Sequence, residues 1–464
     1  MSDRANSTSH AIVIGGSMAG LLAGRALTDH FDRVTIIERD RFPDGPLPRK
    51  GVPQARHVHA LLVRGRIVLE QLFPDLEAEL VAAGAAQMDV SADFKWLSPG
   101  GWGPRFQSGV VTISCSRDLL EWSIRRRLAA SGKIRFGEAC DVIDLLPNAD
   151  NTGVSGVRTR SRSRSNGEAD GTADLRADLI VDASGRGSQA PKWLQAMGYP
   201  APRETTINSY LGYSSRWYAP PSGFQADWKA LLIQSKPPDM ARGGGIVPLE
   251  GKRWIVTLSG AARDYPPTDE AGFLDFARSL RSPSLYESIK DAEPLSPIYG
   301  YQRTENRLRH YEHLSRWPER FVVLGDAVCV FNPVYGQGMT TAALGALMLD
   351  RCLRTQRRTD GGLTGLARRF QKQLARTNAD AWLMATGEDF RYPATEGGRR
   401  DWTTRLMHRY MDRVLLLAAE RPDVFVTFVN VLHLVKPPAA LFRPGILRRV
   451  LMRADGRRRT SAIE

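Results

Sequence analysis

The pattern of apolar and polar positions predicts a strand, a helix and a second strand near the start of the chain. Residues 11–14 (AIVI) form a short apolar run, which the turn GGSMAG separates from LLAGRALTDHF. In that second segment apolar residues recur with a helical period, and VTIIE at 34–38 is again short and apolar. The succession of a short apolar run, a segment of helical period and a second short apolar run indicates a βαβ unit.

Two later stretches repeat the alternation of strand and helix. The first runs from Ser116 through the helix-like DLLEWSIRRRLAAS to the apolar strand ADLIVDASG, with a hairpin between them. The hairpin tip, TRSRSRSNGEADG, alternates Arg with Ser, but it is short, ends in acids and Gly, and lies between two strand signals. A solvated tip fits it better than a nucleic-acid tract. The second stretch, at 321–353, is a strand, a loop and a long helix.

Residues 205–300 differ from both neighbours. They alternate in polarity, contain aromatic residues and are divided by Gly and Pro turns, which is typical of an antiparallel sheet. After residue 389 the pattern is mostly helical. We therefore predict an α/β fold in three parts. They are a discontinuous βαβ-based domain (11–90, 107–200 and 302–390), an inserted sheet domain facing the substrate (91–106 and 201–301) and a helical region (391–464).

Composition narrows the class of protein. The 464 residues are 42% hydrophobic and 25% charged, which is enough for large cores and excludes fibrous or wholly disordered chains. The formal charge of +14 suits nucleic acid, anionic lipid or a polyanionic cofactor alike. Four scattered cysteines form no CxxC pair, so we predict neither a zinc site nor a disulfide framework. A polar N-terminus without a secretory apolar region favours the cytoplasm, and the apolar run 424–435 is too short to span a bilayer.

The glycine-rich turn gives the first chemical signal. Gly15 to Gly20 approximate GxGxxG, with Ser17 in place of the middle glycine. Such a turn lets backbone N–H groups and a helix N-terminus approach a pyrophosphate, and Gly20 lets the helix pack closely on the strand. Glu38, at the end of the next strand, is placed to accept a hydrogen bond from a ribose hydroxyl. We therefore predict a dinucleotide site.

Two further segments indicate that the dinucleotide is FAD. In GDAVCVFNPVYGQGM, Asp326 follows a buried strand, where it can bind a ribityl hydroxyl, while Gly336 and Gly338 offer bare backbone amides to a flavin ring. The mid-chain strand ends at Asp182. Arg117, at the start of the preceding helix, is placed to meet a phosphate or the ribityl chain.

Together these motifs resemble the flavoprotein monooxygenases of the para-hydroxybenzoate hydroxylase type, in which the mid-chain segment is an adjacent Asp-Gly pair rather than the DASG found here. The segments RKGVPQARHVHAL, CSRDLLEW, VDASGRGS, RWIVTLSG and VVLGDAVCVFNPVYGQGM further resemble the flavin-dependent epoxidases of bacterial polyether biosynthesis, of the lasalocid and monensin type, relatives of squalene epoxidase. The likeness spans most of residues 11–395. It implies a Rossmann-like FAD-binding domain of the glutathione-reductase type.

The residues expected to contact FAD come from all of these segments. They are Gly15, Gly16, Ser17, Met18, Ala19, Gly20, Glu38, Arg39, Lys50, Arg56, Arg117, Asp182, Gly325, Asp326, Pro333, Gly336, Gly338 and Met339. Lys50, Arg56, His57 and His59 also suggest a metal or catalytic site, but no acid or Cys joins them at ligand spacing. We predict no metal. A loop lining the flavin is favoured, with Arg56 as its best cofactor contact and His57 orienting the loop.

The resemblance implies an oxygenation reaction. A flavin reduced by NAD(P)H or by a separate reductase takes up O2 as a C4a-hydroperoxide and passes one oxygen atom to a lipophilic substrate. Epoxidation of a polyene or polyketide alkene in secondary metabolism is the leading assignment. Apolar groups from 91–106 and 205–260 are expected to keep the site dry. The aromatic candidates are Trp96, Trp102, Tyr213, Trp217 and Trp254, which also fit an ordinary core and stay outside the predicted site.

Other functions remain open on the sequence alone. They are hydroxylation of another substrate, reduction of prenyl double bonds by an enzyme similar to geranylgeranyl reductase, and flavin-based redox sensing without turnover. A halogenase would share the fold, but the WxWxIP block of tryptophan-type halogenases is missing. No GxSxG, HExxH or P-loop motif indicates hydrolysis or phosphotransfer.

The C-terminal region suggests a second hypothesis. From residue 442 to 464 there are seven arginines against two acids, after the apolar VFVTFVNVLHLVKPPAALF. We favour a helix packed across the substrate cavity with a solvated basic end. The alternative is an interfacial membrane anchor, through which a lipophilic substrate would enter. Nucleic acid is the least needed partner, and the oligomeric state stays open.

Overall fold

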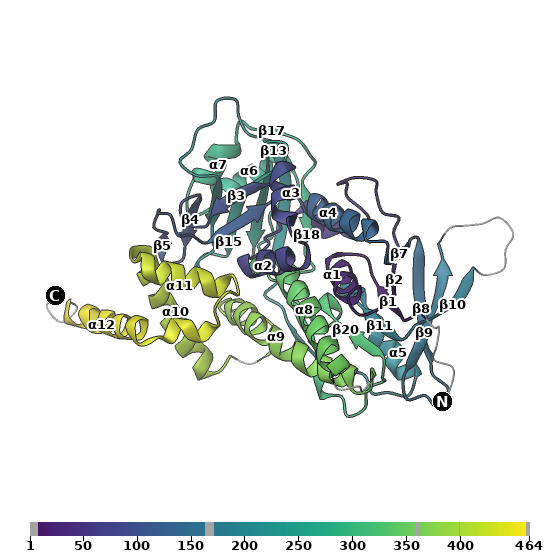
Figure 1. Ribbon diagram of the computed structural model, residues 1–464. Helices are drawn as coiled ribbons and strands as arrows, with labels where there is room; N and C mark the ends of the chain where they lie inside the picture. Colours follow the sequence, from purple (N-terminus) through teal and green to yellow (C-terminus); the bar gives the residue numbers. More distant parts are fainter. Residues whose placement is uncertain (1–7, 163–170, 359–361, 399, 461–464) are drawn as a thin grey trace.

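The computed structural model describes residues 8–162, 171–358, 362–398 and 400–460, with the side chains of the last helix described up to Met452. Five parallel strands form its central sheet, in the order β20-β11-β1-β2-β7 (Figure 1). They are β1 (His10–Ile14), β2 (Arg33–Ile37), β7 (Ile134–Gly137), β11 (Leu179–Asp182) and β20 (Phe321–Val323). The segments are distant in sequence, yet Ile14 pairs with both Ile37 and Asp182. Their carboxyl ends therefore meet at one edge, where open α/β sheets bind ligands.

Helices from the same part of the chain pack around this sheet, and α1, α4 and α9 contact its strands directly. They are α1 (Met18–Leu27), α2 (Val63–Leu72), α3 (Leu76–Ala82), α4 (Arg117–Ala130), α5 (Ala190–Ala196), α8 (Gly338–Arg358) and α9 (Leu366–Asp389). The first predicted βαβ unit is confirmed, with α1 and α8 side by side (Figure 1). A Cβ on Gly24 of α1 would lie 2.8 Å from Ile36 Cδ1, so this glycine lets α1 pack close to β2.

A second sheet of eight strands lies beside the first and belongs to the inserted part of the chain. Its order is β17-β13-β16-β15-β14-β4-β5, and β18 also pairs with β13. The strands are β4 (Phe94–Ser98), β5 (Gly101–Trp102), β13 (Gly212–Ala219), β14 (Ala230–Ile233), β15 (Arg242–Leu249), β16 (Arg253–Gly260), β17 (Glu293–Pro294) and β18 (Tyr299–Tyr301). The antiparallel sheet predicted for residues 205–300 is confirmed, and β4 from the segment 91–106 joins it parallel to β14.

Two further helices and three smaller sheets accompany these two sheets. Helices α6 (Glu270–Arg278) and α7 (Ser284–Ile289) bury Phe273 and Leu285 against the second sheet. The predicted hairpin is β9 (Val154–Ser161) paired with β10 (Thr172–Arg176) next to β8 (Cys140–Pro147); its tip at 163–170 lies outside the described residues. The sheet of β8, β9 and β10 lies beside the central parallel sheet (Figure 1). The other sheets are β3 (Ala86–Asp89) with β6 (Val111–Ser114), and β12 (Glu204–Ile207) with β19 (Asn306–Arg309) and β21 (Cys329–Val330).

The C-terminal helices pack against the second sheet. They are α10 (Trp402–Glu420), α11 (Pro422–Leu432), the 3₁₀ turn η6 (Pro438–Phe442) and α12 (Pro444–Thr460), drawn in yellow in Figure 1. Trp96 of β4 contacts Phe425 and Phe428 of α11, with ring centroids 5.9 and 6.1 Å apart. Within the described part of the chain, every helix is too short or too polar to span a bilayer.

Candidate cofactor and substrate cavity

A cavity of about 1550 Å³ begins at the carboxyl edge of the central sheet and continues between the second sheet and the C-terminal helices. Small-molecule sites commonly measure about 300–1,000 Å³. The space therefore suits a dinucleotide together with a second ligand. Its walls come from all three predicted parts of the chain.

The turn after β1 is built as a dinucleotide cradle. Gly15 has φ +100°, and a Cβ there would lie 2.6 Å from the Ala183 carbonyl oxygen. A Cβ on Gly20 would lie 1.7 Å from the Gly15 carbonyl oxygen, which no side chain tolerates. These glycines bring the backbone of the turn and the N-terminus of α1 to the cavity, where Ser17, Met18 and Ala19 line it. This is the geometry that a pyrophosphate requires.

Glu38 closes one side of this cradle. Its Oε2 accepts a hydrogen bond from the Gly16 N–H at 2.7 Å, and its Oε1 accepts one from the Asp40 N–H at 3.1 Å. The carboxylate is buried at the end of β2 and lines the cavity. It therefore lies where the sequence predicted a ribose contact.

Two buried guanidinium groups flank the same turn. The Arg117 Nη2 donates to Ser17 Oγ at 2.7 Å and to Glu121 Oε2 at 2.9 Å. Arg49 lies 2.8 Å from Glu121, 3.2 Å from Asp40 and 3.3 Å from Glu38. Burial alone would raise the pKa of Glu121, but the Arg117 and Arg49 cations lower it below its ordinary value. Both cations line the cavity, so each can meet a phosphate without leaving Glu121 unpaired.

The structure places Arg49 in the cavity wall, and not its neighbour Lys50, which was predicted to contact the cofactor. Lys50 is exposed and does not line the cavity, whereas the Arg49 side chain turns inward to three carboxylates. Arg56 needs a similar correction as the favoured cofactor contact. It is exposed, and its guanidinium carbon lies over the Tyr299 ring, 4.5 Å from the centroid, outside the cavity wall.

Asp182 also lies behind the wall rather than in it. Its carboxylate is fully buried and accepts hydrogen bonds from the Ser184 N–H at 2.9 Å, from Ser184 Oγ at 2.5 Å and from Ser188 Oγ at 2.5 Å. Burial raises the pKa of Asp182, and these serines oppose that change. Asp182 therefore shapes the 183–187 loop, whose residues line the cavity in its place.

The late segment forms the wall opposite the glycine turn. Asp326 lies in the 3₁₀ turn η4 (Gly325–Ala327) and faces the cavity, and no described residue donates a hydrogen bond to its carboxylate. Gly325 has φ +65°, and a Cβ there would lie 2.7 Å from Ala19 Cβ, so η4 closely approaches α1. Burial raises the pKa of Asp326. An unpaired carboxylate at this point fits a hydroxyl of the ribityl chain.

The loop after η4 continues this wall. Pro333, Gly336, Gly338 and Met339 all line the cavity, as does the exposed Arg39 beyond β2. Gly336 has φ +64° and ends the 3₁₀ turn η5 (Pro333–Tyr335). Of the predicted cofactor contacts, Gly16, Gly20 and Gly325 shape the backbone without lining the space.

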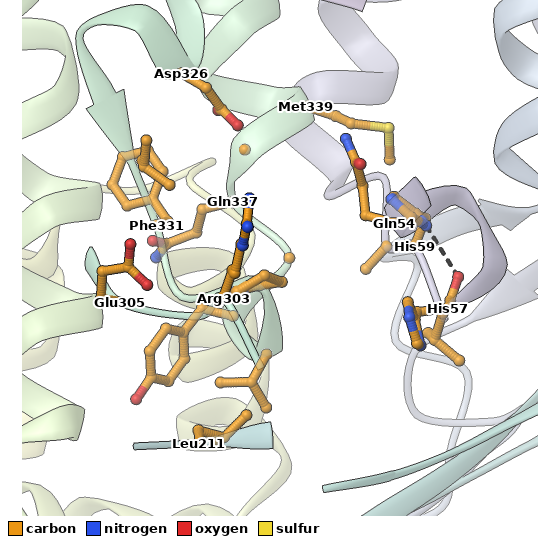
Figure 2. A pocket seen from close by; sticks show the side chains of 18 of the residues that line it. Gln54, His57, His59, Leu211, Arg303, Glu305, Asp326, Phe331, Gln337 and Met339 are labelled. Atoms are coloured by element: carbon orange, nitrogen blue, oxygen red, sulfur yellow. Dashed lines mark hydrogen bonds between the residues drawn. The ribbon is translucent and has the colours of Figure 1, made fainter. Parts of the chain in front are cut away.

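Figure 2 shows two facing sides of the cavity, with Asp326, Gln337 and Arg303 on one and Gln54, His57 and His59 on the other. His57 Nδ1 is 2.8 Å from Ser215 Oγ, and His59 Nδ1 donates to the His57 carbonyl oxygen at 2.9 Å. Burial, followed by the Arg56 cation, lowers the pKa of His57 to about 4. Burial, followed by the Arg117 cation, lowers that of His59 to about 3. Both rings are therefore neutral at neutral pH.

A basic group in the wall of this cavity was not predicted. Arg186, Arg303 and Arg307 line the cavity together with Glu305. Arg186 forms an ion pair with Glu305, whereas no ion pair to the Arg303 guanidinium is found among the described residues. Arg186 lies in the 3₁₀ turn at 185–187, Arg303 in a loop, and Arg307 on the short central strand β19 of a three-stranded sheet. Segments this short contain no periodic pattern that marks which side chain faces inward.

A buried polar network supports the late segment from behind. Asp389, at the end of α9, accepts hydrogen bonds from the Tyr335 hydroxyl at 2.6 Å, from Asn332 Nδ2 at 3.1 Å and from Asn306 Nδ2 at 2.6 Å. Burial raises the pKa of Asp389 to about 6. Tyr335 also lines the cavity, so its phenol connects the buried carboxylate with the ligand space.

The far end of the cavity is apolar. The sheet contributes Phe94, Leu231, Ile233 and Val247, and the helices contribute Met384, Met411, Leu415, Phe428, Val431 and Leu432. Of the five aromatic candidates only Tyr213 lines the cavity. Trp96 and Trp254 are buried in other contacts, Trp217 lies under Arg253, and Trp102 is 41% exposed. The hypothesis of helices packed across the cavity agrees with these wall residues from α10 and α11.

Comparison with known proteins adds two kinds of similarity. The model of a family described as "FAD binding domain" matches residues 8–368. Protein Rv3254 of Mycobacterium tuberculosis is 32% identical over 414 residues, covering 86% of this chain and 84% of that protein.

Solved structures share the fold at low identity. The flavin-dependent brominase Bmp2 superposes with a TM-score of 0.65 at 15% identity, covering 97% of this chain and 100% of its own. The myxobacterial chondrochloren halogenase CndH gives 0.61 at 17%, covering 94% and 97%. PqsL of Pseudomonas aeruginosa, a probable FAD-dependent monooxygenase, gives 0.58 at 17%, covering 90% and 98%.

Proposed function

Because the chain belongs to the family of FAD-binding domains, we propose that it is an FAD-dependent monooxygenase that inserts one oxygen atom from O2 into a lipophilic substrate. One observation supports this most: a single cavity joins the dinucleotide cradle to an apolar chamber. A reaction partner bound in the chamber therefore lies in the same water-poor space as the cofactor.

The residues around the cradle fit FAD. Arg49 and Arg117 offer cations to the pyrophosphate beside the N-terminus of α1, and Glu38 offers a carboxylate to the adenosine ribose. Asp326 would offer its carboxylate to the ribityl hydroxyls, and the backbone at Gly336 and Gly338, which lines the cavity, would lie beside the flavin ring. When bound and reduced, the flavin activates O2; one oxygen atom enters the substrate and the other leaves as water.

The protein groups around the chamber serve binding and exclusion of water. No wall residue is charged in the apolar part formed by β14, β15 and α11, and the nearby His57 and His59 are neutral at neutral pH. An alkene needs no protein base for oxygen transfer, so we propose epoxidation of a polyene or polyketide alkene as the specific reaction. The electrons come from NAD(P)H or from a separate reductase.

Halogenation is the second candidate, because the brominase Bmp2 and the halogenase CndH share the fold over nearly the whole chain. At these identities the likeness concerns architecture and not the reaction. The two proposals differ in an easily measured requirement, because halogenation consumes a halide ion and oxygen insertion does not.

Product mass tests the proposal. The purified protein is analysed for bound FAD, then supplied with NADPH, a flavin reductase, isotopically labelled O2 and squalene or another linear polyene, with and without bromide. We expect a product that is heavier by one labelled oxygen atom in either buffer. A product that gains two hydrogens indicates a reductase, and one that gains bromine indicates a halogenase. NADPH consumption without any product from the polyenes would reject a monooxygenase of this substrate class.

A further inference from the structure

The far end of the cavity opens through an apolar rim. Three of its wall residues are large, apolar and substantially exposed: Leu383 of α9 at 62%, Met407 of α10 at 44% and Phe442 of η6 at 37%. A residue that both lines a cavity and faces solvent lies where the cavity opens. The chamber therefore reaches the surface between the C-terminal helices, away from the glycine turn.

Exposed apolar residues continue outward from this rim. Trp402 and Leu406 of α10 are 71% and 58% exposed, and Leu451 and Met452 of α12 are 55% and 60% exposed. Trp402 and Leu406 are four residues apart, so they lie on one face of α10, adjacent to Met407. Nine of the fifteen exposed large hydrophobic side chains of the described chain lie from Leu383 onward. Trp402, Leu406 and Met407 form an apolar patch at the rim, and such a patch on a folded protein marks an interaction surface. Leu451 and Met452 lie apart from it, near the other end of α10, because Arg449 pairs with Asp423 at the start of α11.

This patch is not the apolar run that suggested an anchor in the sequence. Val424, Phe425 and Val429 of that run are buried in α11 and pack against Trp96 and its neighbours. The exposed apolar side chains belong instead to the flanking helices α10 and α12, whose sequences alternate apolar residues with arginines.

The C-terminal region carries an excess of positive charge. Residues 400–452 contain nine Lys and Arg against four Asp and Glu. Two of those acids already pair with arginines, Asp412 with Arg391 and Asp423 with Arg449. Arg405 and Arg409 of α10 are exposed, four residues apart, and form no ion pair with a described acid. On α10 a stripe of cations therefore runs beside the stripe of Trp402 and Leu406.

We propose that this surface, formed by Trp402, Leu406, Met407 and the neighbouring Arg405 and Arg409, docks the protein on the surface of an anionic membrane. Apolar side chains next to unpaired arginines match the boundary between acyl chains and anionic headgroups. The cavity mouth then faces the bilayer, so that a lipophilic substrate passes from the lipid into the chamber. This last step rests on the proposed function, whereas the docking itself does not.

The test uses sedimentation of the full-length, flavin-loaded protein with vesicles. Vesicles of phosphatidylcholine are compared with vesicles that also contain phosphatidylglycerol, at low and high salt. The test variant is Trp402→Glu/Leu406→Glu. The matched control is Val81→Glu/Leu295→Glu, which adds the same charge at two apolar side chains that are each 43% exposed elsewhere. None of these four residues lines the cavity, and bound flavin reports correct folding.

We expect sedimentation with the anionic vesicles only, weakened by salt. The Trp402/Leu406 variant should bind at least about tenfold less, and the control less than about twofold less. Absence of vesicle binding, or equal losses in both variants, would overturn the proposal. Light scattering that shows a dimer lost in the Trp402/Leu406 variant would assign the surface to a second copy instead. If the protein binds vesicles but never oxygenates a polyene, only the proposed function fails.

Discussion

Replacing Arg117 by Met should weaken FAD binding strongly while leaving the fold intact. The guanidinium is buried at the first residue of α4, and its Nη2 lies 2.7 Å from Ser17 Oγ in the glycine turn. A pyrophosphate on this turn takes a charge-assisted hydrogen bond from it, worth about 1.5–3 kcal/mol. Losing that contact raises the dissociation constant about 10- to 150-fold. Met keeps the length and apolar stem of the side chain, so packing changes little.

The structure also limits the cost of this change to stability. Glu121 loses Arg117 as a partner but keeps Arg49 at 2.8 Å, so no buried carboxylate is left without a cation. Arg126→Met is a suitable control, because Arg126 is on the same helix and pairs with Glu79, but its side chain is 55% exposed and faces away from the cavity.

Quenching of flavin fluorescence during titration of the apoproteins measures the two dissociation constants, and urea denaturation measures stability in parallel. The Arg126 variant should bind FAD as the parent protein does. An unchanged dissociation constant in the Arg117 variant, or an equal loss in both variants, would refute the role given to Arg117.

Three further changes test other parts of the site. Gly20→Ala places a Cβ 1.7 Å from the Gly15 carbonyl oxygen, so we expect the purified variant to show no flavin absorbance. The control variant Gly445→Ala should retain the flavin, because a Cβ at Gly445 meets nothing within 4 Å. Burial lowers the pKa of His57 from 6.5 to about 4, so at pH values between 6.5 and 4 the unfolded chain binds a proton at His57 that the folded protein does not. Up to about 3 kcal/mol of folding stability is therefore lost as the pH falls through this range. His57→Asn, which keeps a hydrogen bond to Ser215, should flatten that pH dependence in urea denaturation; an unchanged slope would contradict the assignment. Tyr335→Phe removes a donor to Asp389, whose pKa is about 6, so it should cost about 1–3 kcal/mol of stability at pH 8 and clearly less at pH 5. An equal cost at both pH values would show that Asp389 does not change its charge between them.

The sequence predicted the dinucleotide cradle because its signals are local. A turn of glycines between a strand and a helix has one low-energy arrangement, and the structure shows it in the φ of Gly15 and the contact at Gly20. The position of Glu38 at the cavity could be predicted because it stands at the end of a strand. Parallel pairing then brings the remaining segments to the same edge, as Asp182 beside Ile14 shows.

Side-chain direction in irregular segments could not be predicted in this way. Lys50 and Arg49 are neighbours in a loop without a period, and only the packed position of Glu121, 72 residues later in the chain, determines which of them turns inward. Asp182 ends a strand as expected, but two serines of the following loop satisfy its carboxylate and keep it out of the cavity. Both outcomes depend on residues distant from the motif or on hydroxyl groups that have no periodic signature.

The apolar chamber illustrates a second limit of prediction from sequence, because its walls combine one sheet and three helices. An aromatic residue on an alternating strand faces one side or the other, and the sequence does not say which side the helices cover. Trp96 therefore packs under α11, whereas Tyr213 reaches the cavity.

The hydrogen bonds of Asp389 connect the loop beside the dinucleotide cradle with the sheet that forms the apolar chamber. Asp389 is on α9, Asn306 is on β19, and Tyr335 is on the loop that faces the proposed flavin ring. Asn332 of that loop also accepts a hydrogen bond from the Tyr213 hydroxyl of the second sheet at 3.3 Å. A shift of the sheet that forms the chamber must therefore move or break contacts of the loop beside the ring. Buried hydrogen bonds to a carboxylate are costly to break, so this network holds the loop beside the dinucleotide cradle in place relative to the sheet that forms the chamber.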